Sequence, residues 1–400
     1  MKKTLSILIG MIIITSCNNS KNSSTGDNKT IKSIDLPYLI DIEKNLTDTK
    51  SVPLSSIGKQ LEYIPLETSP NSMIKGIQQI RFSEDFIFIH DYEKILQFDR
   101  KGKFLRQIGS NGRGPGEYIG ISEFCIDQTN KKIFVNECGA VCKILEYDFN
   151  GSYIRSFIQP WRSYQFIVYD ATGLIFHLTH DNDTTVYSKY NFFITDYNFN
   201  PINKIKRYFI RKSNIAARKI PLYYYNNVLR FKQYTIDTLY TLENEKPKLY
   251  AIFKLGKTKL DPNIMFDGHN PNVAEMIKEI ENFIDISKIL ENDNYLFTNI
   301  AFGVGDSSKN CIFNKQSART TIIEDEGFKN DIDGGIPFWP KYIYNDSILV
   351  DYVDAFKLLN MIHSRELNNL KEEGKNRIDQ FDILTKNLTE TSNPVLIVLK

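Results

Sequence analysis

The sequence lacks any marked excess of charge, since its 400 residues include 50 Lys and Arg against 48 Asp and Glu. A nucleic-acid-binding surface needs a concentrated basic excess, so this balance argues against nucleic acid as a partner. Tryptophan is scarce, with 2 residues against 22 Tyr and 26 Phe, and this abundance of Tyr and Phe favours β-strands over helical bundles. A composition of 42% hydrophobic and 24% charged residues excludes collagen-like, disordered and polytopic membrane proteins.

Motifs of familiar enzyme classes are also missing. The chain has no Gly-x-Ser-x-Gly nucleophile elbow and no His-Glu-x-x-His zinc helix. Its five histidines stand in no recognisable motif: His90, His177, His180, His269 and His363. On a strand, His177 and His180 would point to opposite faces and would not reach one metal ion. The sequence therefore assigns no catalytic residue, no metal ligand and no cofactor, while its 48 acidic residues are compatible with a glycosidase carboxylate pair.

The N-terminal residues have the layout of an export signal. Lys2 and Lys3 precede an apolar run over residues 5–14, which is too short to span a bilayer. Small or β-branched residues then lead into Cys17, which resembles the lipobox of bacterial lipoproteins. That resemblance implies a signal peptide over residues 1–16 and an acylated Cys17 as the mature N-terminus.

The segment after Cys17 is polar and rich in Ser and Asn, so it cannot bury a core. We expect residues 17–49 to form a lipidated N-terminus and flexible tether, and residues 50–400 to form the folded domain. Asn18 stands where some envelope systems have a retention Asp, which favours the outer membrane, on its periplasmic or surface side.

A repeat of about fifty residues runs through the folded part. Residues 95–106 match residues 144–155, with Ile, Leu, Asp, Gly and Arg identical and aromatic residues exchanged. Residues 197–201 form a third, shorter copy. Each copy predicts two strands joined by a tight turn that contains Asp or Asn.

Two further strand-like segments precede each of these hairpins, at residues 76–82 and 86–89, 124–126 and 133–135, and 166–169 and 174–176. Four strands per unit at this period are typical of a propeller blade. A parallel α/β fold would need a crossover helix in each unit, and the units have no room for one. We therefore predict an all-β fold, a six-bladed β-propeller.

The last three units are less regular, with strands near residues 237–253, 295–319 and 340–350. Apolar residues at helical spacing predict short helical insertions over residues 273–290 and about 355–384. We expect residues 61–66 and 394–399 to share the final blade, so that the two chain ends close the ring. Pro65 fits only an edge strand there.

These segments resemble the six-bladed β-propeller lipoproteins of Bacteroidetes, which are distantly similar to NHL-repeat proteins. The resemblance rests on residues 61–68, 98–104, 109–118 and 393–397, and it covers the chain from about residue 50 to its end. It implies a propeller fold and a location in the cell envelope, but no activity.

A glycine-rich loop over residues 109–118 carries Arg113 and Glu117. Its backbone N–H groups, with Arg113, suit an anion, although no Lys-Ser/Thr follows as in nucleotide-binding loops. The simpler interpretation is that its glycines supply positive φ between two blades.

Two Trp-containing clusters, at residues 161–162 and 338–340, either form a stacking platform for a sugar or peptide or fill the wedges between blades. A third aromatic cluster at residues 223–225 has the same two interpretations. The ligand-binding candidates are Arg113, Glu117, Trp161, Arg162 and Trp339.

Four cysteines besides Cys17 permit disulfides in an exported chain: Cys125, Cys138, Cys142 and Cys311. A bridge from Cys138 to Cys142 would be short and local, whereas the simpler interpretation is that all four are buried thiols.

A propeller fold does not decide between binding and catalysis. The leading hypothesis is a binding or scaffold module that is held at the membrane by lipid and recognises a protein, peptide or glycan. The alternative is an envelope enzyme, a lyase or glycan hydrolase, with its site at the mouth of the central channel. The enzyme predicts a His, paired carboxylates or a metal at that mouth.

Overall fold

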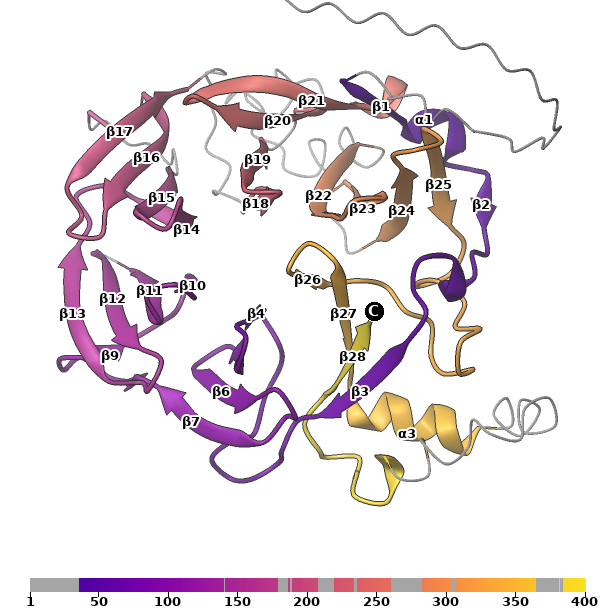
Figure 1. Cartoon of the computed structure of the whole chain (residues 1–400), viewed down its shortest axis with the longest axis horizontal. Coiled ribbons are helices and arrows are strands. Elements are labelled where there is room, and N and C mark those ends of the chain that lie inside the picture. Colours follow the sequence, from indigo (N-terminus) through magenta and orange to yellow (C-terminus); the bar gives the residue numbers. More distant parts are fainter. Residues whose placement is uncertain are drawn as a thin grey trace, which may run out of the picture. The chain divides into compact units, whose positions relative to one another are not determined.

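Six mainly antiparallel sheets surround a common axis in the computed structural model, so the predicted six-bladed β-propeller is confirmed (Figure 1). The structure describes residues 36–139, 141–178, 186, 187, 189–207, 219–233, 236–259, 283–303, 307–364, 381 and 384–400.

The first three blades follow the repeat, and the first strand of each is innermost (Figure 1). They contain β4 (Gln79–Phe82), β5 (Phe86–His90), β6 (Ile95–Asp99) and β7 (Phe104–Ile108), then β10 (Glu123–Asp127), β11 (Lys132–Cys138), β12 (Cys142–Asp148) and β13 (Tyr153–Ile158), then β14 (Ser163–Tyr169), β15 (Gly173–Leu178), β16 (Tyr190–Asp196) and β17 (Pro201–Lys206). The short strands β8 (Ser110–Asn111) and β9 (Glu117–Tyr118) pair with each other between the first and second blades.

The repeated Asp explains the hairpin turns. Asp99 Oδ1 accepts hydrogen bonds from the backbone N–H groups two and four residues later, at 2.8 and 2.9 Å. Asp148 and Asp196 make the same pair of bonds in the second and third blades. The carboxylate thus replaces backbone acceptors that the tight turn lacks.

The repeated Arg joins consecutive blades. Arg106 Nη1 donates to the backbone oxygen of Asn150 in the next turn at 2.7 Å. Arg155, which is the matching residue of the second blade, donates through Nη1 to Asn198 Oδ1 at 3.1 Å. The repeat therefore encodes an inter-blade contact as well as a hairpin.

The last three blades take in strands from the N-terminal part of the chain. They contain β18 (Leu222–Tyr225), β19 (Val228–Lys232), β20 (Thr238–Glu243), β21 (Lys246–Lys254) and β1 (Tyr38–Asp41), then β22 (Ile284–Glu291), β23 (Tyr295–Phe302), β24 (Ser308–Asn314), β25 (Arg319–Ile323) and β2 (Thr49–Lys50), then β26 (Tyr342–Tyr344), β27 (Ile348–Val353), β28 (Val395–Leu399) and β3 (Leu61–Pro65). The helical elements are α1 (Ile42–Asn45), η1 (Leu54–Ser56), η2 (Gly256–Thr258) and α3 (Ala355–His363).

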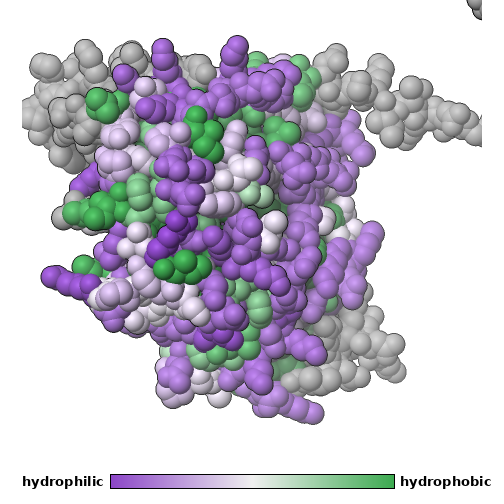
Figure 2. Space-filling view, turned by 60° about the vertical axis from the view of Figure 1, so that its left-hand side comes forward, coloured by the Kyte–Doolittle hydropathy of each residue, from purple (hydrophilic) through white to green (hydrophobic). Residues whose placement is uncertain are grey.

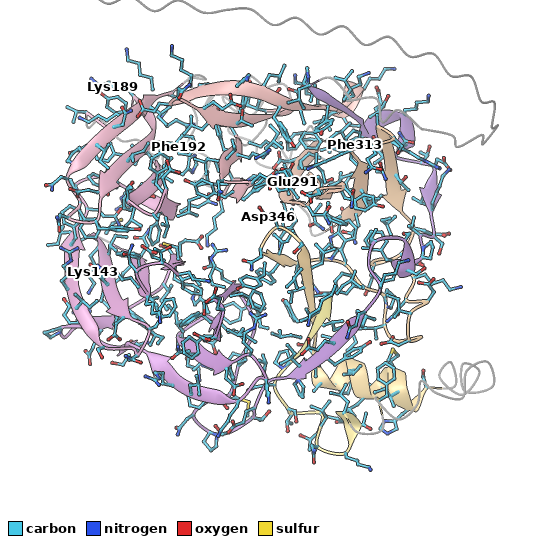
Figure 3. All side chains as sticks on the ribbon, in the orientation of Figure 1. Lys143, Lys189, Phe192, Glu291, Phe313 and Asp346 are labelled. Atoms are coloured by element: carbon cyan, nitrogen blue, oxygen red, sulfur yellow. The ribbon has the colours of Figure 1, made fainter. Side chains whose placement is uncertain are left out.

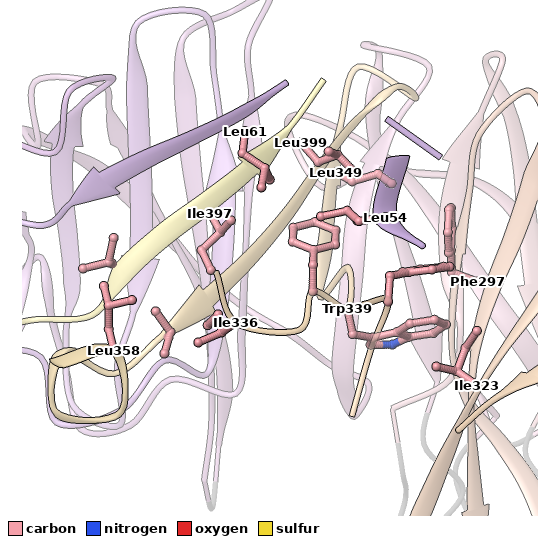
Figure 4. Packing of buried hydrophobic residues seen from close by; sticks show 14 of the residues in the cluster. Leu54, Leu61, Phe297, Ile323, Ile336, Trp339, Leu349, Leu358, Ile397 and Leu399 are labelled. Carbon is pink, nitrogen blue, oxygen red and sulfur yellow. The ribbon is translucent and has the colours of Figure 1, made fainter. Parts of the chain in front are cut away.

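The ring closes as predicted, because β28 and β3 pair in the sixth blade, with Val395 opposite Pro65. β3 is the outermost strand, so Pro65 removes a donor that no neighbouring strand needs. Figure 4 shows the hydrophobic cluster behind this closure, where Leu61 and Ile397 face the side that also holds Trp339.

The folded unit begins before the expected boundary at residue 50. β1 and β2 add as parallel outer strands to β21 and β25, in the fourth and fifth blades. Ile40 and Ile42 are fully buried there, so this part of the expected tether belongs to the core.

The predicted helix over residues 273–290 is wrong in its described part, because residues 284–291 form β22. Ile284 and Ile286 alternate as in a strand, and a bulge at Ser287 then shifts the burial to Ile289. Because of the bulge, the buried residues Ile286 and Ile289 are three positions apart, as they would be on one face of a helix. The residues before 283 lie outside the described part of the chain, and the second predicted helix is confirmed over α3.

The face seen in Figure 2 is mostly hydrophilic, with separate hydrophobic residues between polar ones. No helix among the described residues has both the length and the hydrophobicity needed to cross a membrane.

Candidate functional site

The glycine-rich loop is organised by its own side chains. Glu117 accepts a hydrogen bond from the Gly114 backbone N–H at 2.8 Å, and its carboxylate occupies the place where Gly112 would carry a Cβ. Gly116 has a φ of +75°, which favours glycine. Arg113 is exposed beside the loop. Glu117 thus stabilises the loop between the first two blades, and Arg113 remains a surface candidate.

The two tryptophans are buried, with exposed fractions of 4% for Trp161 and 6% for Trp339. Trp161 packs 4.3 Å from Phe193 between ring centres, and Trp339 stacks on Phe328 at 5.5 Å. Both rings therefore fill wedges between blades, which argues against a stacking platform. Arg162 is exposed and donates to the Gly139 backbone oxygen at 3.3 Å. The structure does not bring the five candidates together at one site.

The cysteines differ among themselves. Cys125 and Cys311 are buried free thiols, and burial raises the pKa of both. Cys142 is disulfide-bonded, which corrects the free-thiol interpretation for this residue. The β11–β12 register places Cys138 directly opposite it.

A group of charged side chains from several blades gathers near the start of the innermost strands. We call it the axial cluster: Arg81, Glu123, Lys219, Lys288, Lys341 and Asp351. Glu123 is buried and accepts from Arg81 Nη2 at 3.3 Å and from Lys219 Nζ at 2.9 Å. Glu123 begins β10 of the second blade, whereas Lys219 precedes β18 of the fourth. Contact between blades that are not adjacent places these groups on the axis side of the ring.

The other half of the axial cluster belongs to the fifth and sixth blades. Lys288 Nζ lies 4.7 Å from the centre of the Tyr342 ring. Lys341 forms a salt bridge with Asp351 and lies 4.4 Å from the centre of the Tyr352 ring. Desolvation, followed by the charge of Lys341, lowers the pKa of Lys288 to about 8; Asp351 opposes this shift and Arg81 adds to it. Four cations and two carboxylates leave this cluster with a net positive charge.

His90 ends β5 beside this cluster and is 4% exposed. Its ring lies edge-on to Phe124, with 6.3 Å between centres. Neither ring nitrogen has a hydrogen-bond partner within the described ranges. Burial, followed by the charge of Lys219, lowers the pKa of His90 to about 4, so the imidazole is neutral at physiological pH.

The opposite end of the innermost strands is bridged by the protein itself. Asp346, labelled near the centre of Figure 3, accepts from the Asn226 backbone N–H at 2.9 Å. This bond joins the inner hairpin turns of the sixth and fourth blades. Both ends are therefore crossed by a contact between blades that are not adjacent, Asn226 with Asp346 at this end and Lys219 with Glu123 at the end that holds the axial cluster.

A second charged group, the Glu291 cluster, lies between the fourth and fifth blades (Figure 3). Glu291 is buried and accepts hydrogen bonds from Lys315 Nζ at 2.6 Å, the Tyr223 hydroxyl at 2.8 Å and the Tyr250 hydroxyl at 2.5 Å. Arg230 Nε forms an ion pair with it at 3.0 Å. Both oxygens of the Glu291 carboxylate thus accept hydrogen bonds within the protein, which is typical of a structural network. Tyr223 of the predicted aromatic cluster has its role here.

No group of three His, Cys, Asp or Glu side chains is arranged to hold a metal ion in the parts of the chain that the structure describes. His177 lies on β15 and is buried, and His363 is exposed at the end of α3. His180 and His269 lie outside the described residues.

Residues 37–400 match the family model described as a domain of unknown function, DUF4934. The chain belongs to this family. A Bacteroides fragilis protein whose name provisionally describes it as exported has a similar structure, with 18% identity and a TM-score of 0.68, over 91% of this chain and 99% of that one. At that identity the similarity shows the fold. A Bacteroides vulgatus member of the DUF4221 family also matches, with 11% identity and a TM-score of 0.46, over 66% of this chain and 84% of that one. No curated protein sequence matches the chain.

Proposed function

We propose that this protein is a lipoprotein of the cell envelope, held by an acylated Cys17, whose propeller is a binding module. The axial cluster is its ligand-binding site. The observation that carries the proposal is the convergence of Arg81, Glu123, Lys288 and Lys341 at one end of the axis, from four different blades. Residues so distant in sequence meet only because the ring places them together, as in propeller sites formed by successive blades.

The anchor rests on the sequence pattern at residues 1–17. The provisional name of the similar Bacteroides fragilis protein as exported agrees with it. We place the lipid in the outer membrane, because Asn18 stands where a retention signal would have Asp.

Binding is favoured over catalysis by the state of the two carboxylates. Glu123 already accepts from Arg81, Lys219 and Gln79, and Asp351 accepts from Lys341 and from the Trp339 backbone N–H at 3.0 Å. An acid or base for glycan cleavage needs a carboxylate that reaches the substrate. The neutral, unpartnered His90 is the one observation that favours an enzyme, a lyase or glycan hydrolase.

Glycan and peptide arrays probed with the full detergent-solubilised chain test the binding site. The Arg81→Gln variant should lose about tenfold or more in affinity for any array ligand that the wild type retains, because a charged hydrogen bond is removed. Arg113→Gln is the matched control and should bind as the wild type does. Loss of binding in Arg113→Gln but not in Arg81→Gln would mean that the site is at the glycine-rich loop. Cleavage of a bound glycan would show that the protein is an enzyme.

Metabolic labelling with palmitate tests the anchor. The wild type should incorporate the label and sediment with membranes, and Cys17→Ala should do neither. A variant that fractionates with membranes as the wild type does would contradict the lipoprotein proposal.

A further inference from the structure

The charges of the chain are unevenly distributed along its sequence. Residues 189–259 contain 15 Lys and Arg against 4 Asp and Glu, whereas the rest of the chain contains 35 against 44. This basic segment runs from the residue before β16 to the residue after η2, and it supplies the outer hairpins of the third and fourth blades. A nearly neutral chain thus has a basic segment and an acidic remainder, and this asymmetry favours an anionic partner for the basic part.

Three lysines lie around one tyrosine on the rim of the third blade. Lys189 Nζ is 5.5 Å and Lys204 Nζ is 5.7 Å from the centre of the Tyr190 ring, and Lys206 lies opposite Tyr190 in the pairing of β16 with β17. All three lysines are exposed, and none has a salt-bridge partner in the described part of the chain. Figure 3 shows Lys189 at the outer edge of the ring. These like charges repel one another and favour the approach of an anion.

The rim of the fourth blade continues this positive surface. β17 and β20 contribute to one hydrophobic cluster, so the two blades adjoin (Figure 1). Lys246 and Lys254 of β21 and Lys257 of η2 are exposed and have no salt-bridge partner among the described residues. Glu243 and Asp237, which are acids of the same blade, already pair with two other lysines. We call the six unpaired lysines the basic rim: Lys189, Lys204, Lys206, Lys246, Lys254 and Lys257.

Exposed leucines accompany the basic rim where the described chain begins. β1 pairs in parallel with β21, with Tyr38 opposite Ala251. Leu36 precedes β1 and is 54% exposed, and Leu39 within β1 is 49% exposed. Leu249 of β21, two residues before Ala251, is 39% exposed. Apolar side chains among lysines are typical of surfaces that lie at a membrane interface.

The position of the proposed anchor agrees with this surface. Cys17 lies 19 residues before Leu36 in the sequence. A lipid at Cys17 attaches the domain through the fourth blade, so the rim of that blade faces the membrane more often than the rim of the first blade. This step alone rests on the proposed acylation, whereas the lysines and leucines are features of the folded domain.

We infer that the basic rim docks on an anionic membrane surface, with its lysines against phospholipid phosphates and the exposed leucines at the level of the headgroups. An acyl chain and a basic surface are two signals that together give stable anchoring. Each Lys close to an anionic bilayer strengthens binding about fivefold. A ring that rests on its rim leaves both ends of its axis open to solvent, including the end that holds the axial cluster.

Flotation with lipid vesicles tests the docking on the full chain with Cys17→Ala, which carries no acyl group. Vesicles that contain about one quarter phosphatidylglycerol should bind at least tenfold more strongly than vesicles of phosphatidylcholine alone, and added NaCl should weaken this binding. Equal binding of both vesicles, or no binding of either, would overturn the inference. Because this chain is unacylated, the result is independent of the palmitate experiment.

Paired substitutions locate the contact. Lys204→Gln with Lys206→Gln should lower binding to the anionic vesicles about tenfold or more. Lys101→Gln with Lys103→Gln is the matched control, since it removes the same charge from exposed residues in the outer hairpin of the first blade. Residues 1–16 are common to both variants, so any contribution from that apolar run cancels. Equal weakening in both would mean that the vesicles respond to net charge, and would contradict docking through the basic rim.

The leucines are tested at a salt concentration that screens the lysines. Leu36→Gln with Leu39→Gln should lower the remaining vesicle binding several-fold. Tyr92→Gln with Phe356→Gln is the control, because these side chains are 64% and 53% exposed but belong to the first and sixth blades. Unchanged binding in the leucine variant, at an unaltered melting temperature, would reject contact between the leucines and the membrane.

Inorganic phosphate distinguishes a membrane surface from a free anion. At equal ionic strength, sodium phosphate and sodium chloride should release the protein from the anionic vesicles to the same extent, because the basic rim responds to an extended charged surface. Stronger release by phosphate would mean that the lysines bind a free anion, and would overturn the docking.

Discussion

The two charged clusters of the ring contain similar residues but differ in how completely those residues are paired. In the Glu291 cluster, two cations and two phenols surround one buried carboxylate, both oxygens of which accept hydrogen bonds. In the axial cluster, four cations share two carboxylates; among the described residues Lys288 has no salt-bridge partner, and the nitrogens of the nearby His90 have no hydrogen-bond partner. A satisfied network stabilises one structure, whereas an unsatisfied one leaves interaction energy for a ligand.

The largest effect should follow from removing the carboxylate of the Glu291 cluster. Glu291→Gln removes the only carboxylate that Arg230 and Lys315 contact within the described ranges, and leaves two buried cations. We expect the free energy of unfolding in urea to fall by about 3–5 kcal/mol. Glu243→Gln is the control, because its pair with Lys248 is exposed, and it should unfold as the wild type does. Equal behaviour of the two variants would contradict the structural role of Glu291.

A pH series should distinguish the unpartnered histidine. The pKa of His90 is about 4 in the folded chain and near 6.5 in the unfolded chain, so the unfolded chain takes up the proton first as the pH falls. Stability should therefore decline between pH 6.5 and 4, by up to about 1.4 kcal/mol per pH unit, and His90→Leu should lose this part of the decline. His363→Leu, at an exposed residue, should follow the wild type. An identical pH profile for wild type and His90→Leu would reject the buried neutral imidazole.

The smallest effect, with the opposite sign, is expected at Lys288. Lys288→Met removes a half-buried cation next to Arg81 and Lys341 and keeps the contact with the Tyr342 ring. Thermal unfolding should show unchanged stability or a gain of up to about 1 kcal/mol. A loss as large as that of Glu291→Gln would mean that Lys288 has a structural partner and that the two clusters do not differ.

The sequence predicts the parts of the fold that repeat. Asp99 and Asp148 recur because each hairpin turn needs the same acceptor, and Pro65 marks an outer strand because it lacks a donor. The later blades were recognisable only as strands, since their turns use other residues such as Asn314. The helix predicted over 273–290 failed in β22 because a bulge and a helix place apolar residues at similar intervals.

The axial cluster could not be predicted from the sequence because its members share no motif. Arg81, Glu123 and Lys288 lie in different blades, and only the ring brings them together. One sequence signal could have located the cluster. If the blades are aligned with one another, charged residues stand out in innermost strands that are otherwise apolar. Trp161 and Trp339 stood out in the sequence by their side-chain size, but burial decides their role, and both lie in the core.

β1 and β2 precede β3, the strand that closes the ring, and their order along the chain determines how the ring responds to a pulling force. A pull on the described chain from residue 36 meets β1 first, where Asp41 also binds Thr320 of β25 through its backbone N–H at 3.0 Å. β2 comes next, and only then β3, whose loss would open the circle. Both early strands must detach before the force reaches the pairing of β3 with β28, so a pulling force would remove outer strands of the fourth and fifth blades before it opens the ring.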